Sequence, residues 1–360
     1  MRADIADELP RAVSLQVTEA CNLRCRMCYE WGETGIYSRP DGPRKAAVLD
    51  LELAKRIVGE LAPARPYYSL FGGEPLMYPG LDELVRVIKR AGSFVDTPTN
   101  GTLLAKHAAM LVETGFDYVR VSLDGPRDID DRQRGAGSYD EAMAGIAALQ
   151  REKRQAGSVV PMVGIIYTVT PANHTSLEQF FLRDLDLDSI GPVTIQMQNY
   201  VTPQMGEAYA RLLRTKFDLA SERYWRSLLR APADFAEMDL AELSRQATVV
   251  RERLQALGTP VQFLPPTLTR DSLDAYFAAR WSDIADTYTH CSVPWLSADV
   301  TARGELAPCH VFYDLVMGSL HEHSFEELWN GERYRTFRAH MRNEGLMPIC
   351  HGCCILYFVH

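Results

Sequence analysis

Three cysteines lie close together near the start of the chain, as Cys21, Cys25 and Cys28 in the stretch CNLRCRMC. They follow a short alternating apolar run at 14–18, which predicts a strand that leads into the cysteine loop. Thiolate is the soft ligand that iron–sulfur clusters need, so this loop suits one [4Fe–4S] cluster with one iron left open for a small ligand. A structural zinc site would require four ligands. Disulfides between such close neighbours would be strained.

A second motif follows one helix and one strand later. A helix is expected at 51–61 with Asp50 as its N-cap, and a strand at 66–71 runs directly into GGEP at 72–75. Two glycines at a strand end permit close backbone approaches, and a glutamate can accept hydrogen bonds from an ammonium group. Taken alone, the tetrapeptide is equally compatible with an ordinary turn.

Strands and helices alternate through the first two hundred residues. Further strands are expected at 96–99, 118–123, 163–169 and 193–198, and further helices at 81–91, 104–114, 139–155 and 177–182. This alternation predicts an α/β fold with a parallel sheet, which right-handed crossovers would curl into a partial (β/α)6 barrel. The motifs fall after strands, at the edge where α/β proteins place their sites.

The cysteine loop resembles the C-x3-C-x-Φ-C signature of radical S-adenosylmethionine (SAM) enzymes, with Met27 at the usually aromatic position Φ. The GGEP motif resembles the turn that binds the methionine ammonium of SAM in that family. The resemblance implies a cluster on Cys21, Cys25 and Cys28 that cleaves SAM to a 5′-deoxyadenosyl radical, which takes a hydrogen atom from substrate. The SAM-binding residues that it implies are Met27, Gly72, Gly73, Glu74, Pro75, Asn100 and Ser122.

The region 203–288 differs in character, because it is rich in Arg, Glu, Leu and Ala with helical spacing at 206–229, 239–257 and 270–288. It contains no chemical motif. We expect a helical bridge between a core at 1–202 and a C-terminal module at 289–360.

That module contains the remaining cysteines. Strands at 296–301 and 305–310 are expected to form a hairpin, followed by a helix at 325–341. The four cysteines Cys291, Cys309, Cys350 and Cys353 are enough to close a metal site, for which zinc remains an alternative on spacing alone. Cys354 is then left over, as a spare buried thiol, an alternative ligand or a hydrogen donor, of which the spare thiol is the simplest.

The spacing C-x12-G-x4-C followed by C-x2-C resembles the Twitch and SPASM extensions of radical SAM enzymes. These extensions hold auxiliary [4Fe–4S] clusters, and the one-cluster Twitch form fits the cysteines of this chain. The resemblance implies a second cluster on Cys291, Cys309, Cys350 and Cys353.

Substrate contacts are expected in two places. The loop after the cysteines supplies Glu30 and Glu33, and the end of the last strand supplies Gln196, Gln198 and Tyr200. Loops beside a rigid scaffold often carry such contacts, although each of these side chains could equally face solvent.

The expected substrate is small and derived from a sugar or nucleoside. The C-x3-C-x-Met-C form, GGEP and chain size resemble cytosylglucuronate decarboxylases of antibiotic biosynthesis, which implies removal of a carboxylate from a nucleoside uronic acid. Dehydrogenation of an aminocyclitol, with the second cluster as electron acceptor, and peptide modification are the alternatives. Either reaction requires an electron donor such as a flavodoxin or ferredoxin. A non-catalytic iron–sulfur carrier is the remaining alternative.

Composition excludes some classes of protein. The formal charge of −9 argues against a nucleic-acid-binding surface. No apolar run is long enough for a membrane span, and the acidic N-terminus lacks the apolar core of a signal peptide. We therefore expect a cytoplasmic protein, in which clustered cysteines indicate metal binding or catalysis.

Overall fold

The computed structural model describes residues 8–284 and 288–357. Within these residues, one sheet of ten strands runs in the order β10-β9-β8-β1-β2-β3-β4-β5-β6-β7. The strands are β1 (Ala12–Thr18), β2 (Tyr67–Gly72), β3 (Val95–Thr99), β4 (Tyr118–Ser122), β5 (Met162–Val169), β6 (Val193–Met197), β7 (Val261–Leu264), β8 (Ser297–Val300), β9 (Glu305–Ala307) and β10 (Gly318–Ser319). The helices are α1 (Leu51–Leu61), α2 (Leu81–Arg90), α3 (Leu104–Glu113), α4 (Arg127–Arg134), α5 (Ser138–Ala156), α6 (Leu177–Gln179), α7 (Pro203–Phe217), α8 (Leu240–Ala256), α9 (Arg270–Phe277), α10 (Val293–Leu296), α11 (Phe325–Trp329) and α12 (Glu332–Asn343).

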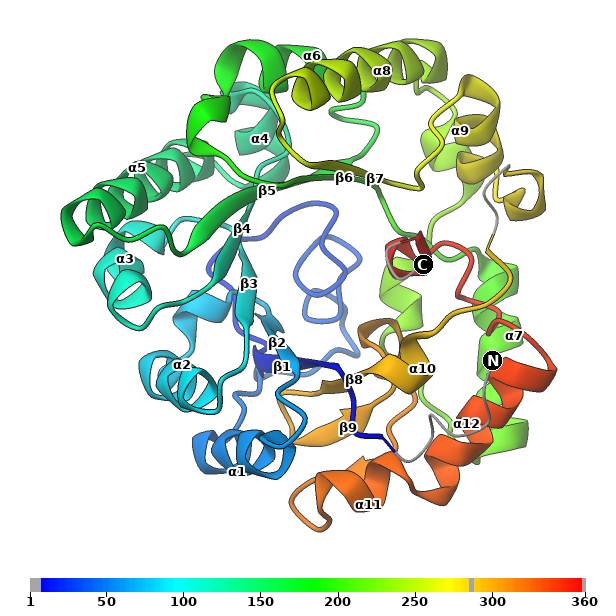
Figure 1. The fold of residues 1–360 in the computed structure, drawn as a ribbon. Coiled ribbons are helices and arrows are strands. Elements are labelled where there is room, and N and C mark those ends of the chain that lie inside the picture. The colour runs from blue at the N-terminus through cyan, green and yellow to red at the C-terminus, as the bar shows by residue number, and fades with distance from the viewer. Residues whose placement is uncertain (1–7, 285–287, 358–360) are drawn as a thin grey trace.

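The sheet curls into an open barrel. Each neighbouring pair from β8 through β1 to β7 is parallel, while β9 and β10 are added antiparallel. Helices α1 to α6 and α8 lie outside the curve, and the loop after β1 lies inside it (Figure 1). This architecture confirms the expected α/β barrel fold with a C-terminal module.

Alternation along each strand explains the layers. In β1, Val13, Leu15 and Val17 are buried in the core, while Ser14 and Gln16 lie on the opposite face. Helix α1 covers the apolar side with Leu53, Ile57 and other buried residues, and its first turn is capped by Asp50, whose Oδ1 accepts from the Leu53 amide at 2.8 Å.

The bridge is less helical than its composition predicts. Helix α7 ends at Phe217 and α9 ends at Phe277, so the expected helices 206–229 and 270–288 were too long; residues 285–287 of the latter lie outside the described residues. Strand β7 falls within the bridge and pairs with β6, with Val193 opposite Val261. Strand β7 has only four residues, so its alternating pattern is too short to be recognised between two stretches with helical spacing.

Other elements also differ from the prediction: β9 ends at Ala307 rather than at 310, and α6 ends at Gln179 rather than at 182. Helix α4, directly after the turn at 124–126, was not expected, because its sequence RDIDDRQR carries little apolar periodicity. The expected helix 325–341 is two helices that are separated at Asn330 and Gly331. Ser324 starts the first with a capping box that includes Glu327.

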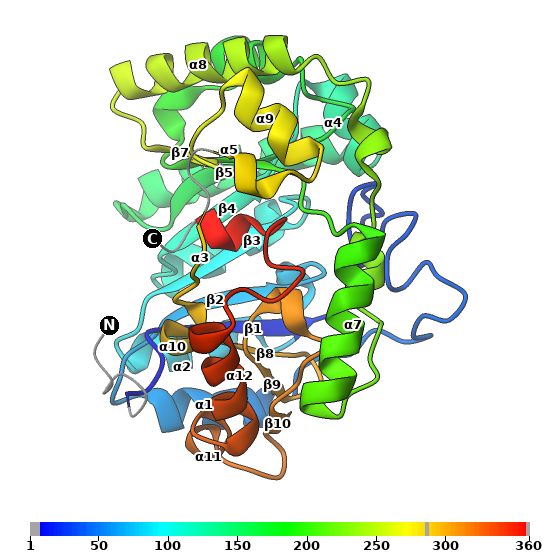
Figure 2. The ribbon, with the colours of Figure 1, turned by 90° about the vertical axis from the view of Figure 1, so that its right-hand side faces the viewer.

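The C-terminal hairpin is continuous with the barrel sheet. Strand β8 pairs in parallel with β1, with Ala12 opposite Ser297 and Leu15 opposite Val300, and β9 then pairs with β8 around Gly304, whose φ is +75°. Helix α7 and the C-terminal segment 350–357 lie where the curve of the sheet is open (Figure 2). No helix among the described residues is long and apolar enough to cross a membrane.

Candidate functional site

The three cysteines of the first loop are held by backbone contacts. The Cys28 amide donates to the Cys25 carbonyl at 3.0 Å. The Sγ atoms of Cys21 and Cys28 accept from the amides of Leu23 and Trp31, both at 3.4 Å. Amide donors to cysteine sulfur are among the means by which proteins tune iron–sulfur clusters, so this geometry fits a cluster on the loop.

Burial also favours a cluster on these thiols. It raises the pKa of Cys21 and of Cys28 to about 12, and it raises the pKa of Cys25. Negative charge on neighbouring cysteines and on Glu30 contributes in the same direction. Half-buried thiols with pKa values raised in this way are stable as thiolates near neutral pH only when a positively charged group binds them, which is what cluster iron provides.

The two glycines of GGEP let β2 end against the segment that leads into the cysteine loop. A Cβ on Gly72, whose φ is +143°, would lie 2.1 Å from the Thr18 carbonyl oxygen, and a Cβ on Gly73 would lie 2.3 Å from that of Ala20. The Gly73 amide donates to the Thr18 oxygen at 2.8 Å. The motif therefore fixes the cysteine loop to the end of the neighbouring strand.

Glu74 joins β2 to β3. Its Oε1 accepts from Thr99 Oγ1 at 2.7 Å and from the Leu76 amide at 3.0 Å, and its Oε2 accepts from the Asn100 amide at 2.8 Å. The side chain is 1% exposed. Each carboxylate oxygen accepts about two hydrogen bonds, so Oε2 retains acceptor capacity for an ammonium group such as that of SAM.

The other expected SAM residues lie at the same edge of the sheet. Asn100 Nδ2 donates to Asn22 Oδ1 at 3.0 Å and lies 3.9 Å from Cys21 Sγ, which ties the end of β3 to the cysteine loop. Ser122 is half-buried at the end of β4, and Met27 is half-buried on the loop itself. Pro75 begins the short 3-10 helix Pro75–Met77.

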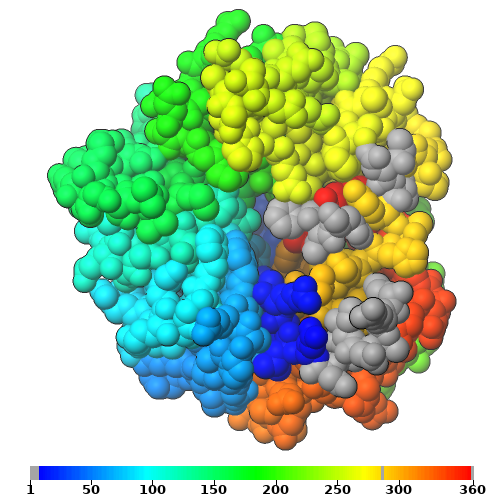
Figure 3. Space-filling view, in the orientation of Figure 1, coloured from blue at the N-terminus to red at the C-terminus, as the bar shows by residue number. Residues whose placement is uncertain are grey.

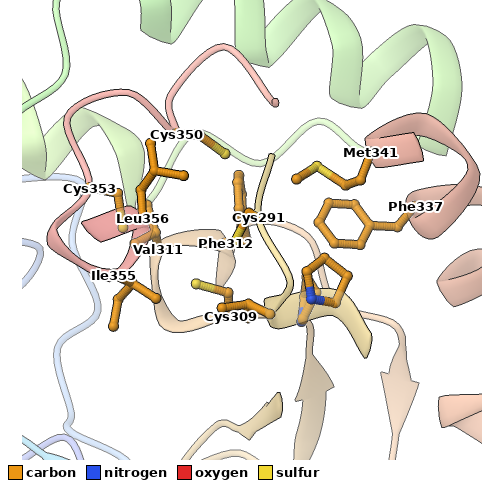
Figure 4. Close-up of a pocket in the computed structure, with 13 residues that line it drawn as sticks. Cys291, Cys309, Val311, Phe312, Phe337, Met341, Cys350, Cys353, Ile355 and Leu356 are labelled. Carbon is orange, nitrogen blue, oxygen red and sulfur yellow. The ribbon is translucent and has the colours of Figure 1, made fainter. Parts of the chain in front are cut away.

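The second cysteine set surrounds one pocket. Cys291, Cys309, Cys350 and Cys353 line it together with apolar side chains, and its empty volume, including space open to solvent, is about 390 Å³. Figure 4 shows the four cysteines around this pocket, with Val311 and Leu356 among them. Burial raises the pKa of Cys350, Cys353 and Cys309, so this site also suits iron-bound thiolates.

Cys354 is directed elsewhere. Its Sγ accepts from Asn199 Nδ2 at 3.3 Å, and its amide donates to Asn199 Oδ1 at 3.0 Å. It is not among the residues that line the pocket. All eight cysteines are free thiols in the structure.

The described residues contain no group of three or more histidine, cysteine, aspartate or glutamate side chains arranged to hold a single metal ion. A [4Fe–4S] cluster requires a different arrangement, because its irons are bound by separate thiolates. The C-terminal set is of that kind, with its four cysteines spread around one pocket.

Comparison with known families covers the regions that contain the two cysteine sets. Residues 15–174 match the radical SAM superfamily model, and residues 291–354 match the model of the SPASM iron–sulfur cluster-binding domain. The chain therefore carries a radical SAM domain and a SPASM domain. The first uses a [4Fe–4S] cluster and SAM, and the second binds auxiliary iron–sulfur clusters.

Full-length relatives of this radical SAM SPASM chain are distant in sequence. Pre-heme d1 synthase of Dinoroseobacter shibae is 25% identical over 97% of this chain and 80% of its own length. The tungsten-containing aldehyde ferredoxin oxidoreductase cofactor-modifying protein of Pyrococcus furiosus is 24% identical over 95% of this chain and 86% of its own.

Solved structures agree on the fold. SuiB of Streptococcus suis, bound to S-adenosylmethionine, has a TM-score of 0.63 at 16% identity and covers 96% of this chain and 73% of its own. The anSMEcpe structure with bound AdoMet has a TM-score of 0.60 at 15% identity, over 91% of this chain and 82% of its own. The radical SAM fold of this chain is thus shared along nearly its whole length.

Polar side chains share the inner face of the barrel sheet. Strand register places them on the side opposite to the helices, because paired residues of neighbouring strands lie on the same face. We call them the interior residues: Ser14, Ser69, Asp96, Tyr118, Arg120, Ser122, Thr168, Thr194, Gln196 and Asp299. The surface is hollowed near the centre of the view along the barrel (Figure 3).

The expected substrate contacts are distributed unevenly. Gln196 is an interior residue, and its Nε2 donates to Thr168 Oγ1 at 3.1 Å. Glu30 is 3% exposed and accepts from Gln16 Nε2 at 2.8 Å. Burial raises the pKa of Glu30 to about 8, to which the charge of Glu19 also contributes. The carboxyl is therefore largely protonated near neutral pH.

The remaining three expected contacts are placed less favourably. Glu33 is exposed, and Gln198 is buried just after β6. Tyr200 is 1% exposed, its hydroxyl donates to the Tyr276 carbonyl at 2.6 Å, and its ring packs on Phe235 and Trp281. Its place in an aromatic core supports a packing role. The alternation of β6 does not predict where the Tyr200 side chain points, because the strand ends at Met197, three residues earlier.

Arg134, a buried residue at the end of α4, was not predicted from the sequence. Its Nη2 lies 2.7 Å from Asp124 Oδ2, and its charge lowers the pKa of Cys25 against the larger effect of burial. The same helix contacts the cysteine loop, because the Arg26 amide donates to the Gln133 carbonyl at 2.9 Å. An isolated arginine in a polar helix carries no motif that would single it out.

Proposed function

We propose that this radical SAM SPASM-type enzyme acts on a small, polar, sugar-derived substrate on the interior face of the barrel, and that the reaction is decarboxylation of a nucleoside uronic acid such as cytosylglucuronate. When bound, the reduced cluster and SAM supply a 5′-deoxyadenosyl radical that abstracts hydrogen from substrate. The chain's own residues bind and orient the sugar and keep water away.

The polar interior face carries the proposal. Hydroxyl, amide and carboxyl side chains from β1, β4, β5, β6 and β8 occupy positions that an apolar ligand would not require. Two of these groups already form the side-chain hydrogen bond between Gln196 and Thr168. Sugar hydroxyls both donate and accept hydrogen bonds, so they match such a surface.

The protein also supplies the fixed geometry that hydrogen abstraction needs. Glu74, Asn100 and the cysteine loop are linked by the hydrogen bonds described above, so cluster and SAM would be held by the ends of β2 and β3. The interior residues of β4 to β6 lie along the same sheet. A substrate on them would be oriented relative to SAM by a rigid scaffold.

A second candidate, dehydrogenation of an aminocyclitol, is favoured by a different observation. His310 follows directly after Cys309, which lines the pocket of the second cluster, and its ring lies 5.6 Å from the ring of Phe71 on β2. His310 Nδ1 also lies 3.7 Å from Oδ1 of the interior residue Asp299. The second cluster site is therefore close to the interior face, as an electron acceptor for the substrate would need to be.

The test is an anaerobic assay of the reconstituted, reduced protein with cytosylglucuronate and with a panel of aminocyclitols, read by mass spectrometry. Loss of CO2 together with 5′-deoxyadenosine supports decarboxylation. Loss of two hydrogen atoms from an aminocyclitol supports the second candidate. A protein that forms no 5′-deoxyadenosine with any substrate would contradict the enzyme proposal and favour an iron–sulfur carrier.

A matched pair of variants controls the assay. Cys25→Ala removes a ligand of the expected SAM cluster and should abolish 5′-deoxyadenosine formation. Arg86→Gln changes an exposed side chain on the outer surface of α2, where Arg86 pairs with Asp82. This variant should form 5′-deoxyadenosine as the wild-type protein does.

A further inference from the structure

Arg120 is a charged side chain on the interior face of the barrel. Its neighbours in β4, Val119 and Val121, are 0% exposed in the core, so Arg120 points to the opposite side. In register it lies opposite Pro98 on β3 and Gly164 on β5. Neither neighbour has a long side chain, and the Tyr118 ring lies over Gly164, with its hydroxyl 2.3 Å from where a Cβ of Gly164 would be.

The guanidinium is held by two neighbours. Nε lies 2.5 Å from Oδ2 of Asp96, whose side chain is 0% exposed, and Nη2 donates to Ser69 Oγ at 3.2 Å. A buried ion pair contributes little net stability, because desolvation offsets the attraction. The guanidinium, a planar group with five N–H donors, is oriented by the hydrogen bond from Nη2 to Ser69, while Asp96 pairs with Nε by charge without a hydrogen bond.

The C-terminal module reaches the interior face, where His310 Nδ1 lies 3.7 Å from Asp299 Oδ1. The Arg120 side chain remains 23% exposed. The His310 ring lies 5.6 Å from the ring of Phe71, which follows Ser69 by two residues on β2. A ligand on the interior face near Ser69 and Arg120 would therefore lie close to this module.

The other charged groups around this face are arranged differently. Arg223 and Arg303 both pair with the buried carboxylate of Glu19, at 3.4 and 3.0 Å. Burial raises the pKa of Asp299 to about 7, so its negative charge is reduced near neutral pH. Arg120 thus remains an oriented cation on the polar face.

We infer that Arg120 binds a carboxylate of the substrate through its Nη1 and Nη2 edge, while Asp96 pairs with Nε. This inference rests on the proposed function and deepens it, because it names the residue that binds the carboxylate of the uronate. A planar guanidinium and a carboxylate form paired, charge-assisted hydrogen bonds, and a lysine could not reproduce that geometry.

The test measures binding by calorimetry on the anaerobic protein loaded with both clusters and SAM. The probes are cytosylglucuronate and its neutral carboxamide. The wild-type protein should prefer the carboxylate, and Arg120→Gln should lose about 100-fold in affinity for it while binding the carboxamide almost as before. Arg120→Lys should recover only part of the loss, and Arg86→Gln, on the outer surface, should keep the wild-type preference.

Removing Arg120 alone leaves the Asp96 carboxylate buried without its partner, so Arg120→Gln can fail to fold. The double variant Arg120→Gln/Asp96→Asn removes both charges and keeps the shape of the pair. It should retain both clusters by absorption and the wild-type affinity for SAM, yet show no preference for carboxylate over carboxamide. A double variant that keeps the wild-type preference would overturn the inference.

Two further outcomes separate this inference from the proposed function. A wild-type protein that binds both probes equally, or neither of them, has no carboxylate site, which overturns the role of Arg120. If that protein still forms 5′-deoxyadenosine with an aminocyclitol, radical chemistry on a small polar substrate stands without the uronate.

Discussion

The amide of Asn100 donates to Oε2 of Glu74 at 2.8 Å, which links the end of β3 to the GGEP motif at the end of β2. Through Asn22, the Asn100 side chain extends the link to the cysteine loop. Two of the expected SAM-binding residues and the cluster loop are thus parts of one hydrogen-bonded unit.

Replacing Glu74 by Gln should weaken SAM binding. If the new oxygen takes the place of Oε1, the amide group faces the Asn100 N–H, and a buried donor left without an acceptor costs about 1–3 kcal/mol. We expect about a tenfold loss of SAM affinity and a lower melting temperature, measured by equilibrium dialysis and thermal melting of the cluster-loaded protein. Glu83→Gln, on the exposed side of α2, is the control. Unchanged SAM affinity in Glu74→Gln would contradict the assignment.

Gly73→Ala should impair the first cluster selectively. Its Cβ would lie 2.3 Å from the Ala20 carbonyl oxygen, a backbone atom directly before Cys21. We expect iron content to fall from about eight to about four atoms per chain, with the second cluster retained. Gly59→Ala is the matched control, because its Cβ would meet no heavy atom within 4 Å and alanine favours its helix. Full iron content in Gly73→Ala would contradict this prediction, because it would show that the end of β2 can move away from Ala20 without loss of the cluster.

Iron content should distinguish the cluster ligands of the C-terminal module from the non-ligand cysteine Cys354. Cys309→Ser should remove about four irons per chain, because Cys309 lines the pocket. Cys354→Ser should keep the full iron content, because the Cys354 sulfur accepts a hydrogen bond from Asn199 and Cys354 does not line the pocket. Iron and sulfide analysis after anaerobic reconstitution measures both. Equal losses in the two variants would make Cys354 a ligand.

Asp299→Asn should stabilise the protein at alkaline pH. Burial raises the pKa of Asp299 to about 7, so the folded state holds a proton that the unfolded state has already released. Stability contributed by this proton is present below about pH 4 and is lost as pH rises to about 7, a change of at most about 4 kcal/mol. The asparagine variant lacks this loss.

Melting temperatures at pH 5 and pH 8 measure the effect. The variant should melt above the wild-type protein at pH 8, and the difference should shrink by more than half at pH 5. Asp41→Asn, whose side chain is 64% exposed, should show no such pH dependence. A constant difference at both pH values would place the pKa of Asp299 near its ordinary range.

Local patterns in the sequence determined much of this protein. Alternation of apolar residues in β1, the Asp50 cap of α1 and the spacing of the cysteines each depend on residues that are near one another in the chain, so they can be recognised without the fold. The same holds for the hairpin at Gly304, where a positive φ favours glycine.

Only the tertiary structure decided which distant residues meet. It joined β8 to β1, brought Cys354 to Asn199 rather than to the other cysteines, and buried Tyr200 among aromatic rings from the bridge. It also selected Arg120 and Arg134 among the many arginines of the chain. These outcomes depend on strand register and on packing between segments far apart in sequence, which no local pattern encodes.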